Sequence, residues 1–284
     1  MDPKRRFMKN LLFFDIDGTL ITDDERHMFP ADAAAALTAA RSAGNLCFIN
    51  TGRVRCNVET YITAPGFDGL VCGCGTYIEY HGRVLHRHEI SRERCHQLAH
   101  ICRECRMQAF FEHTDVAFYD AGLDMPYILP VVDSMRQQGR PMPGDIDAPD
   151  FRFDKFSGWF DETSDVARFR REIEKDFVYI DRGEMAWESG EDGRERKTAF
   201  FEVEPVGYSK ASGMRFLMEY FGVDRDAVYA FGDSNNDLEM MEYAGHSICM
   251  AGGSEACKAA ADYVTAAVDE GGLRQALEHF RLLS

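Results

Sequence analysis

Four short polar clusters in the sequence carry side chains that could act together in one reaction. They are Asp15-Ile16-Asp17-Gly18-Thr19, Asn50-Thr51-Gly52-Arg53, Ser209-Lys210, and the run from Gly232 and Asp233 to Asp237. Carboxylates only a few ångströms apart cannot all stay ionised unless a cation joins them. Ligands that are all oxygen favour a hard ion such as Mg²⁺. We therefore expect a magnesium site formed by Asp15, Asp17 and Asp233, with Asp237 supporting it.

The remaining members of these clusters suit a tetrahedral oxyanion. Thr51 offers a hydroxyl, Lys210 an ammonium group, and the loop at Gly52 an exposed backbone N–H. Lys210 is also expected on the first turn of a helix, where the helix dipole adds to its positive field. Asn236 could donate its amide N–H to the phosphate or position Lys210. These four residues form the predicted phosphate site.

A carboxylate nucleophile, a second carboxylate two residues later, Mg²⁺ and a phosphate site are the parts needed for phosphoryl transfer through an aspartyl-phosphate. In this hypothesis Asp15 attacks phosphorus in line. Asp17 protonates the leaving oxygen and then accepts a proton from the hydrolytic water. Lys210, together with Mg²⁺, offsets the repulsion between the nucleophile and the phosphate.

The elements that must position these residues alternate between strands and helices. Residues 11–14, 46–49 and 228–231 are apolar runs that end at the polar clusters, which is typical of buried parallel strands. Residues 31–43 lie between Pro30 and Gly44, which predicts a helix. Ligand sites of such sheets lie at the carboxyl ends of the strands. The clusters at Asp15 and Thr51 should therefore meet.

From about Tyr77 the pattern changes to a hairpin followed by mixed helices and strands. We expect an inserted α+β domain over residues 83–199, and a parallel-sheet α/β domain formed by residues 1–82 and 200–284. Helices are predicted over 54–62, 125–138 and 164–177, strands over 178–180 and 200–203, and a solvated loop over 188–196.

Composition limits the partners. The chain has 284 residues, 45% hydrophobic, with 32 basic and 48 acidic residues and a net charge of −16. Such acidity disfavours nucleic acid and membrane surfaces as partners. No apolar run approaches the roughly 18 residues of a membrane span.

The nine cysteines are an odd number, and we expect reduced, mostly buried thiols in a cytoplasmic protein. Cys102 and Cys105, near His96 and His100, suit a helix core stripe better than a zinc site.

Taken together and in order, the clusters resemble the motifs of haloacid dehalogenase (HAD) superfamily phosphatases, and within them the Cof-type subfamily with a type IIB cap. The matching residues are Asp15-x-Asp17-Gly18-Thr19, Thr51-Gly52-Arg53, Ser209-Lys210 and Gly232-Asp233-Ser234-x-Asn236-Asp237. The resemblance implies a Rossmann-like doubly wound core, a cap inserted between the second and third motifs, Mg²⁺ dependence, and hydrolysis of a small phosphorylated metabolite such as a sugar phosphate or phosphorylated cofactor.

The resemblance further implies that Asp15 ligates the metal through its side chain and Asp17 through its backbone carbonyl. Some residues around the site depart from the family pattern. Cys74-Gly75-Thr76 stands where relatives usually have Asn-Gly-Ala, and Ala211 replaces a usual glycine after Lys210. The chemical residues themselves are intact.

Three other functions stay open at this point. A phosphosugar mutase could use the same core and cap. A phospho-signalling receiver also uses an acceptor Asp, a Thr and a Lys, but it is a single domain of roughly 120 residues. An inactive binding module would be expected to lack Asp15 or Asp17. The residues that select the substrate carry no recognisable motif, so Arg152 and Lys155 are candidates from charge alone, and the oligomeric state is open.

Overall fold

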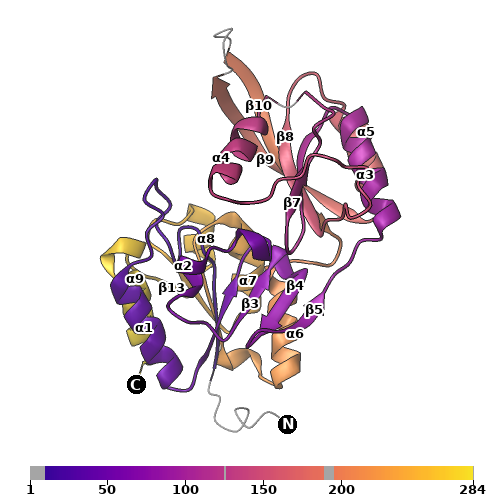
Figure 1. Cartoon of the computed structure of the whole chain (residues 1–284). Helices are drawn as coiled ribbons and strands as arrows, with labels where there is room; N and C mark the ends of the chain where they lie inside the picture. Colours follow the sequence, from indigo (N-terminus) through magenta and orange to yellow (C-terminus); the bar gives the residue numbers. More distant parts are fainter. Residues whose placement is uncertain (1–9, 125, 189–194, 284) are drawn as a thin grey trace. The chain divides into compact units, whose positions relative to one another are not determined.

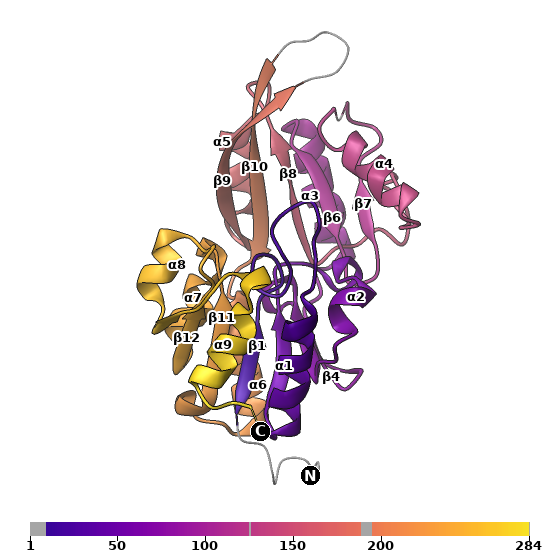
Figure 2. The ribbon, with the colours of Figure 1, turned by 90° about the vertical axis from the view of Figure 1, so that its left-hand side faces the viewer.

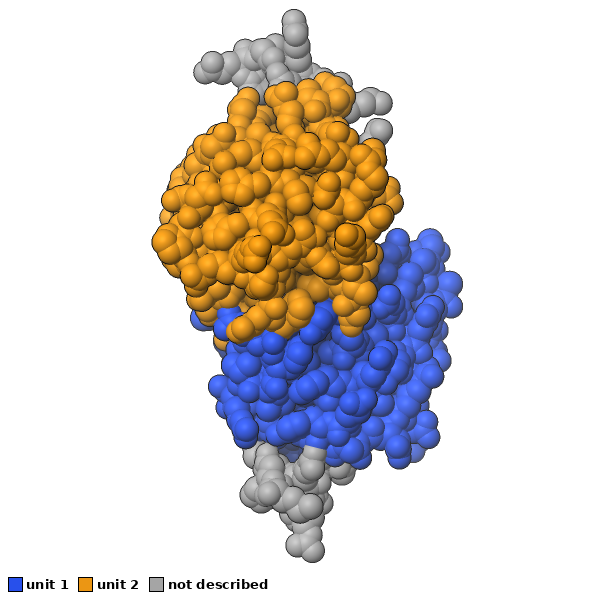
Figure 3. Space-filling model, turned by 90° about the vertical axis from the view of Figure 1, so that its right-hand side faces the viewer, with its two compact units in different colours: residues 1–53, 57–87, 208–284 blue, residues 54–56, 88–207 orange. Residues whose placement is uncertain are grey.

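The computed structural model describes residues 10–124, 126–188 and 195–283. Most of the loop expected over 188–196 lies outside the described residues. The chain divides into two compact units, coloured blue and orange in Figure 3. Unit 1 comprises residues 1–53, 57–87 and 208–284, and unit 2 comprises residues 54–56 and 88–207.

Unit 1 is built on an eight-stranded sheet in the order β13-β12-β11-β1-β2-β3-β4-β5. Strands β13 to β3 of this order pair in parallel, and β4 and β5 add an antiparallel hairpin at one edge. The bounds are β1 Leu11–Phe14, β2 Leu46–Asn50, β3 Gly69–Cys72, β4 Tyr77–Tyr80, β5 Arg83–Arg87, β11 Val228–Gly232, β12 His246–Cys249 and β13 Tyr263–Val264.

Helices cover both faces of this sheet, as Figures 1 and 2 show. Alternate residues of β1 enter two separate cores, because successive side chains of a strand point to opposite faces. Leu12 and Phe14 pack with α1 (Ala31–Ser42) and α9 (Gly272–His279). Leu11 and Phe13 pack with α6 (Lys210–Phe221), α7 (Leu238–Tyr243) and α8 (Glu255–Ala260). The prediction of a doubly wound α/β fold is confirmed.

Unit 2 is an antiparallel sheet in the order β7-β6-β8-β10-β9. Its aromatic core includes Phe111, Phe156 and Phe201 and lies under α3 and α5, whereas α4 packs with Phe110 and Tyr119. The bounds are α3 Arg92–Glu104, β6 Gln108–Glu112, β7 Ala117–Tyr119, α4 Leu129–Gln137, β8 Lys155–Phe160, α5 Val166–Ile173, β9 Phe177–Glu188 and β10 Glu195–Pro205.

Several elements differ from their expected bounds. The helix predicted over 54–62 is instead a 3₁₀ turn, η2 (Arg55–Asn57), followed by α2 (Thr60–Thr63). The two are separate because Glu59 is extended, with ψ near 151°. Helix α4 starts late because Pro130 is tolerated only in the first turn. Strands β9 and β10 extend beyond 178–180 and 200–203. The sequence did not predict the added residues because they are mostly polar and lack the apolar pattern of a buried strand.

The unit boundaries also lie later than the expected 82/83 and 199/200. Strand β5 pairs with β4 and so belongs to unit 1, and β10 pairs with β8 and β9 as far as Pro205. None of the nine cysteines forms a disulfide, and Cys95 and Cys102 of α3, with Cys105 directly after it, lie in the core of unit 2. In the described part of the chain, no helix has the length and apolar character needed to cross a membrane.

Candidate active site

The first motif leaves the carboxyl end of β1 and turns back beside β11. The Asp15 backbone N–H donates to the Phe231 carbonyl at 3.0 Å, and the amides of residues 19–21 donate to the Ile16 carbonyl. Gly18 has a φ of +70°, and a Cβ there would lie 2.4 Å from Asp233 Oδ2. A glycine is therefore required for the loop to approach the Asp233 carboxylate.

Lys210 contacts acidic residues of two motifs. It is the first residue of α6 and is buried. Its Nζ lies 2.8 Å from Asp15 Oδ1 and 2.5 Å from Asp237 Oδ1. It also donates to Asn236 Oδ1 at 3.2 Å. A capping box between Ser209 and Ser212 fixes the start of α6. The structure thus joins the first, third and fourth motifs through one ammonium group.

The fourth motif forms a tight loop after β11 that holds Asp237 and Asn236. Asp237 Oδ2 accepts the backbone N–H groups of Asp233 and Ser234, each at 3.0 Å. Asn236 Oδ1 accepts from Ser234 Oγ at 2.7 Å as well as from Lys210. Of the two roles expected for Asn236, the contact with Lys210 is the one observed.

Three of the four predicted metal ligands come together. Asp15, Asp233 and Asp237 each place one carboxylate oxygen within 4.8 Å of the others, and this is the one such group of acids, histidines or cysteines in the part of the chain that the structure describes. The side chain of Asp17 points to Arg53, and ligation through the Asp17 backbone carbonyl, which the resemblance implies, stays a prediction. Donors that are all oxygen and carry more negative charge than Lys210 can balance fit Mg²⁺.

The proton affinities of the acids reflect their crowding. Burial, and then the charge of Asp237, raise the pKa of Asp15 to about 8, against the opposing effect of Lys210. Burial and Asp237 likewise raise the pKa of Asp233 to about 7. Burial alone would lower the pKa of Lys210, but Asp15 and Asp237 outweigh it and raise that pKa above its ordinary value. The cluster therefore lacks positive charge, which a divalent cation would supply.

The second motif lies at the carboxyl end of β2. Thr51 is buried, and its Oγ1 accepts the Arg53 backbone N–H at 3.1 Å. The Cys74 N–H donates to the Thr51 carbonyl at 3.0 Å, and a Cβ on Gly52 would lie 3.5 Å from Cys74 Sγ. Cys74 has a φ of 54°, a left-handed conformation in which Asn is several-fold enriched. The Asn that the resemblance leads us to expect at this position would suit the same conformation.

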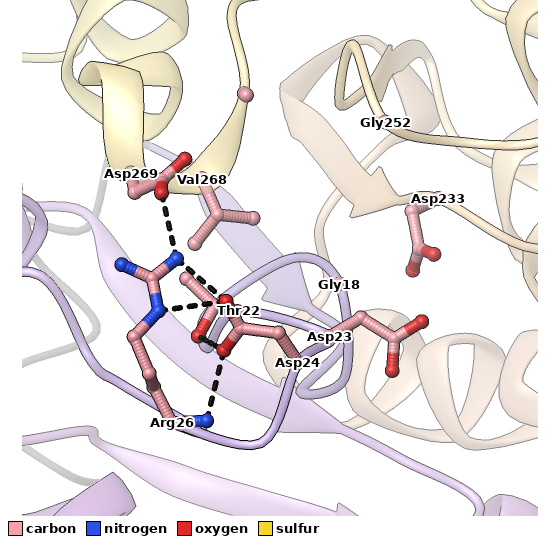
Figure 4. Close-up of a pocket in the computed structure, with 10 residues that line it drawn as sticks. Gly18, Thr22, Asp23, Asp24, Arg26, Asp233, Gly252, Val268 and Asp269 are labelled. Atoms are coloured by element: carbon pink, nitrogen blue, oxygen red, sulfur yellow. Dashed lines mark hydrogen bonds and ion pairs between the residues drawn. The ribbon is translucent and has the colours of Figure 1, made fainter.

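The sequence did not predict the role of Asn50 or the cavity beside Asp233. Asn50 is buried and its Nδ2 donates to the Lys210 carbonyl at 3.0 Å, so it helps fix the start of α6. A cavity of about 210 Å³ opens beside Asp233, and Figure 4 shows Arg26 at its wall between Asp24 and Asp269. The acidic run at residues 23–25 was the available signal for this wall.

Comparisons with known proteins identify the family of the chain. The family model for haloacid dehalogenase-like hydrolases matches residues 12–277. YkrA, a phosphatase candidate of Bacillus subtilis strain 168, is 25% identical over 96% of this chain and 98% of its own. A phosphoglycolate phosphatase of Methanothermobacter thermautotrophicus is 26% identical over 94% of this chain and 96% of its own.

Among solved structures, the HAD subclass IIB sugar phosphatase BT4131 superposes with a TM-score of 0.73 at 25% identity. The match covers 96% of this chain and 100% of that chain. These similarities extend through unit 2 as well as through the sheet that carries the motifs.

Proposed function

We propose that this chain, which belongs to the haloacid dehalogenase-like hydrolase family and is a phosphatase, hydrolyses small phosphomonoesters through an aspartyl-phosphate on Asp15. The observation that carries the proposal is the contact of buried Lys210 with both Asp15 and Asp237, beside Asp233. A buried ammonium next to a candidate nucleophile can offset the repulsion of an arriving phosphate.

Mg²⁺ is the proposed cofactor. Asp15 and Asp233 would hold it through their side chains, Asp17 through its backbone carbonyl as in the resembling family, and Asp237 would support it while fixing Lys210. When bound, the ion supplies positive charge that offsets the negative charge of the phosphoryl group.

The residues then have separate tasks. An Asp15 carboxylate oxygen forms a bond to phosphorus as the bond from phosphorus to the ester oxygen breaks, and Asp17 gives its proton to the departing alkoxide. Water next attacks the phosphorus while Asp17 takes one of its protons. The bond from Asp15 to phosphorus breaks, and inorganic phosphate leaves with both carboxyl groups in their starting forms. Thr51, the Gly52 N–H, Lys210 and Asn236 bind the phosphoryl oxygens.

Unit 2 is the proposed cap that selects the substrate. The relatives named above include a sugar phosphatase and a phosphoglycolate phosphatase, which supports a small phosphorylated metabolite as the substrate class. Lys155 is buried in β8 with its Nζ 4.0 Å from Glu204 Oε1, so its charge has an internal partner. We place the reaction in the cytoplasm and expect no nucleic acid partner.

The test measures both products and the nucleophile. Wild-type protein with Mg²⁺ is incubated with a panel of sugar phosphates, and free phosphate and isomerised phosphosugar are quantified. We expect free phosphate, no isomer, and no turnover in Asp15→Asn. Isomer without phosphate would assign a mutase, and undiminished turnover in Asp15→Asn or in excess chelator would contradict the proposal.

A further inference from the structure

Arg53, the last residue of the second motif, directs its guanidinium at Asp17. Its Nε donates to Asp17 Oδ2 at 3.0 Å and its Nη2 to Asp17 Oδ1 at 2.5 Å. Two parallel bonds from one planar fork fix the plane of a carboxylate as well as its position. This contact defines where both oxygens of Asp17 lie.

The guanidinium is itself held from its other side. Nη1 donates to Glu59 Oε2 at 2.7 Å and to the Asn57 carbonyl at 3.3 Å. Glu59 is the extended residue immediately before α2. Four of the five N–H groups that a guanidinium carries are thus directed at groups of the protein.

The backbone of Arg53 is fixed as well. Its N–H donates to Thr51 Oγ1 at 3.1 Å, and its carbonyl accepts the Gly73 N–H at 2.8 Å. These bonds tie Arg53 to the ends of β2 and β3. The orientation of the Asp17 side chain therefore depends on the loop that follows β2, far from Asp17 in the sequence.

Asp17 needs such support because burial does little to hold its side chain in one orientation. Its side chain is 45% exposed, whereas that of Asp15 is 6% exposed. Among residues 10–124, 126–188 and 195–283, Arg53 alone is seen to hydrogen bond the Asp17 carboxylate. A half-exposed aspartate without this fork would rotate among several staggered rotamers.

We propose that Arg53 is a positioning residue that holds Asp17 in the orientation from which it transfers its proton. The inference rests on the proposed function, in which Asp17 is the proton donor and acceptor. It differs from a direct role in binding phosphate, because the Arg53 fork is directed at Asp17 and Glu59.

The test compares two esters of similar size whose leaving groups differ in basicity. Benzyl phosphate releases a strongly basic alkoxide and needs a proton donor, whereas p-nitrophenyl phosphate releases a stable phenolate and does not. The ratio kcat/KM reports the steps up to departure of the leaving group, so it isolates the proton donation. A group that only maintains the structure would affect both esters equally.

We expect Arg53→Met to lower kcat/KM for benzyl phosphate roughly 10- to 100-fold, a part of the effect typical of general acid catalysis. For p-nitrophenyl phosphate the loss of kcat/KM should stay below about threefold, because its leaving group departs without a proton donor. Arg53→Lys, which keeps the charge but not the planar fork, should fall between wild type and Arg53→Met. In an Asp17→Asn background, Arg53→Met should cause no further loss with benzyl phosphate.

A matched control is the fork between Arg41 and Asp68 in the same unit. Arg41 Nε and Nη2 donate to the two Asp68 oxygens at 3.0 and 3.1 Å. Arg41→Met removes a guanidinium fork of the same geometry, and it should leave the ratio of kcat/KM between the two esters unchanged. Thermal melts of both variants show whether each is folded under the assay conditions.

Three results would overturn the inference while leaving the phosphatase in place. They are equal losses for the two esters in both Arg53 variants, a further loss in the Asp17→Asn background, or a rise of the inhibition constant of inorganic phosphate in Arg53→Met. The last would assign Arg53 to phosphate binding. Failure of the proposed function is seen separately, as wild-type protein that hydrolyses neither ester or Asp15→Asn that retains activity.

Discussion

Asp15 and Asp17 are two residues apart, yet they lie in opposite environments. Asp15 is buried against Lys210, with Asp233 and Asp237 nearby, and its pKa is raised to about 8 by burial first. Asp17 is half-exposed and held by the Arg53 fork, which in turn contacts Glu59. Two identical side chains can take different chemical roles when their environments differ in this way. In the proposed mechanism, the nucleophile Asp15 would therefore depend on buried charge balance, and the proton carrier Asp17 on the orientation of its side chain.

The largest effect should come from removing the charge that balances the buried side. Lys210→Met leaves Asp15 and Asp237 without their ammonium partner. We expect loss of activity on the order of 10³-fold, comparable to removal of a preorganised electrostatic group, and a loss of about 3 to 5 kcal/mol in the free energy of unfolding at neutral pH. Activity assays and urea titrations measure the two losses.

Lys258→Met serves as the control, because Lys258, among the residues that the structure describes, pairs with the exposed Glu255 at 3.2 Å. It should change stability by less than about 1 kcal/mol. Similar losses in the two lysine variants would contradict the distinction between buried and exposed charge.

The next effect tests how tightly the first motif approaches Asp233. Gly18→Ala places a methyl group against the Asp233 carboxylate and also strains a positive φ. Gly82→Ala has the same strain, with a φ of +74°, but its new Cβ meets nothing within 4 Å. We expect both to lose about 1 kcal/mol of stability from backbone strain. Gly18→Ala alone should lose activity, by roughly 10-fold or more, because a small misplacement of reacting groups is costly.

Kinetic assays and thermal melts of the two alanine variants measure this difference. Retained activity in Gly18→Ala would show that Asp233 can move away without consequence. The close packing of the two loops would then have no catalytic meaning.

A smaller effect is expected from pH. The pKa values of Asp15 and Asp233, about 8 and about 7, are raised above their ordinary value of 3.8. The folded state therefore keeps protons that the unfolded state has released, so the stability that these protons provide is lost as pH rises toward the folded values. Without metal, the Tm should fall by a few degrees between about pH 5 and about pH 8.

Mg²⁺ should counteract this fall, because it binds the ionised carboxylates and competes with their protons. Differential scanning fluorimetry should show a larger Mg²⁺-induced rise in Tm at about pH 8 than at about pH 5. A rise that is equal at the two pH values would argue against these acids as the metal ligands.

The placement of the buried residues Asp15 and Lys210 could be predicted from the sequence to a large extent. Asp15 follows an apolar run that suits a buried parallel strand, and Lys210 follows a serine that can cap a helix, so the expected sheet topology brings these motifs toward one edge. Their roles in catalysis stay predictions. The family resemblance and the α/β fold are confirmed by the comparisons.

The contact of the half-exposed Asp17 with Arg53 could not be predicted in the same way. The contact between Arg53 and Asp17 depends on the 3₁₀ turn at Arg55–Asn57 and on the extended Glu59, where the sequence had suggested one helix. Side-chain pairing between residues 36 positions apart leaves no local pattern. In unit 2, the full length of β9 and β10 could not be predicted either, because their outer halves are mostly polar and lack apolar alternation.

The most direct test of the central claim is to trap the phosphoryl group on Asp15. Asp17→Asn, incubated with p-nitrophenyl phosphate and Mg²⁺ and quenched in acid, should form the covalent intermediate but hydrolyse it slowly, because the water has lost its base. Intact-mass spectrometry and peptide mapping should find one added phosphoryl group, on Asp15, and none in the Asp15→Asn, Asp17→Asn double variant. Phosphate that is released at the wild-type rate with no phosphorylated protein, or a phosphoryl group on any other residue, would contradict the account.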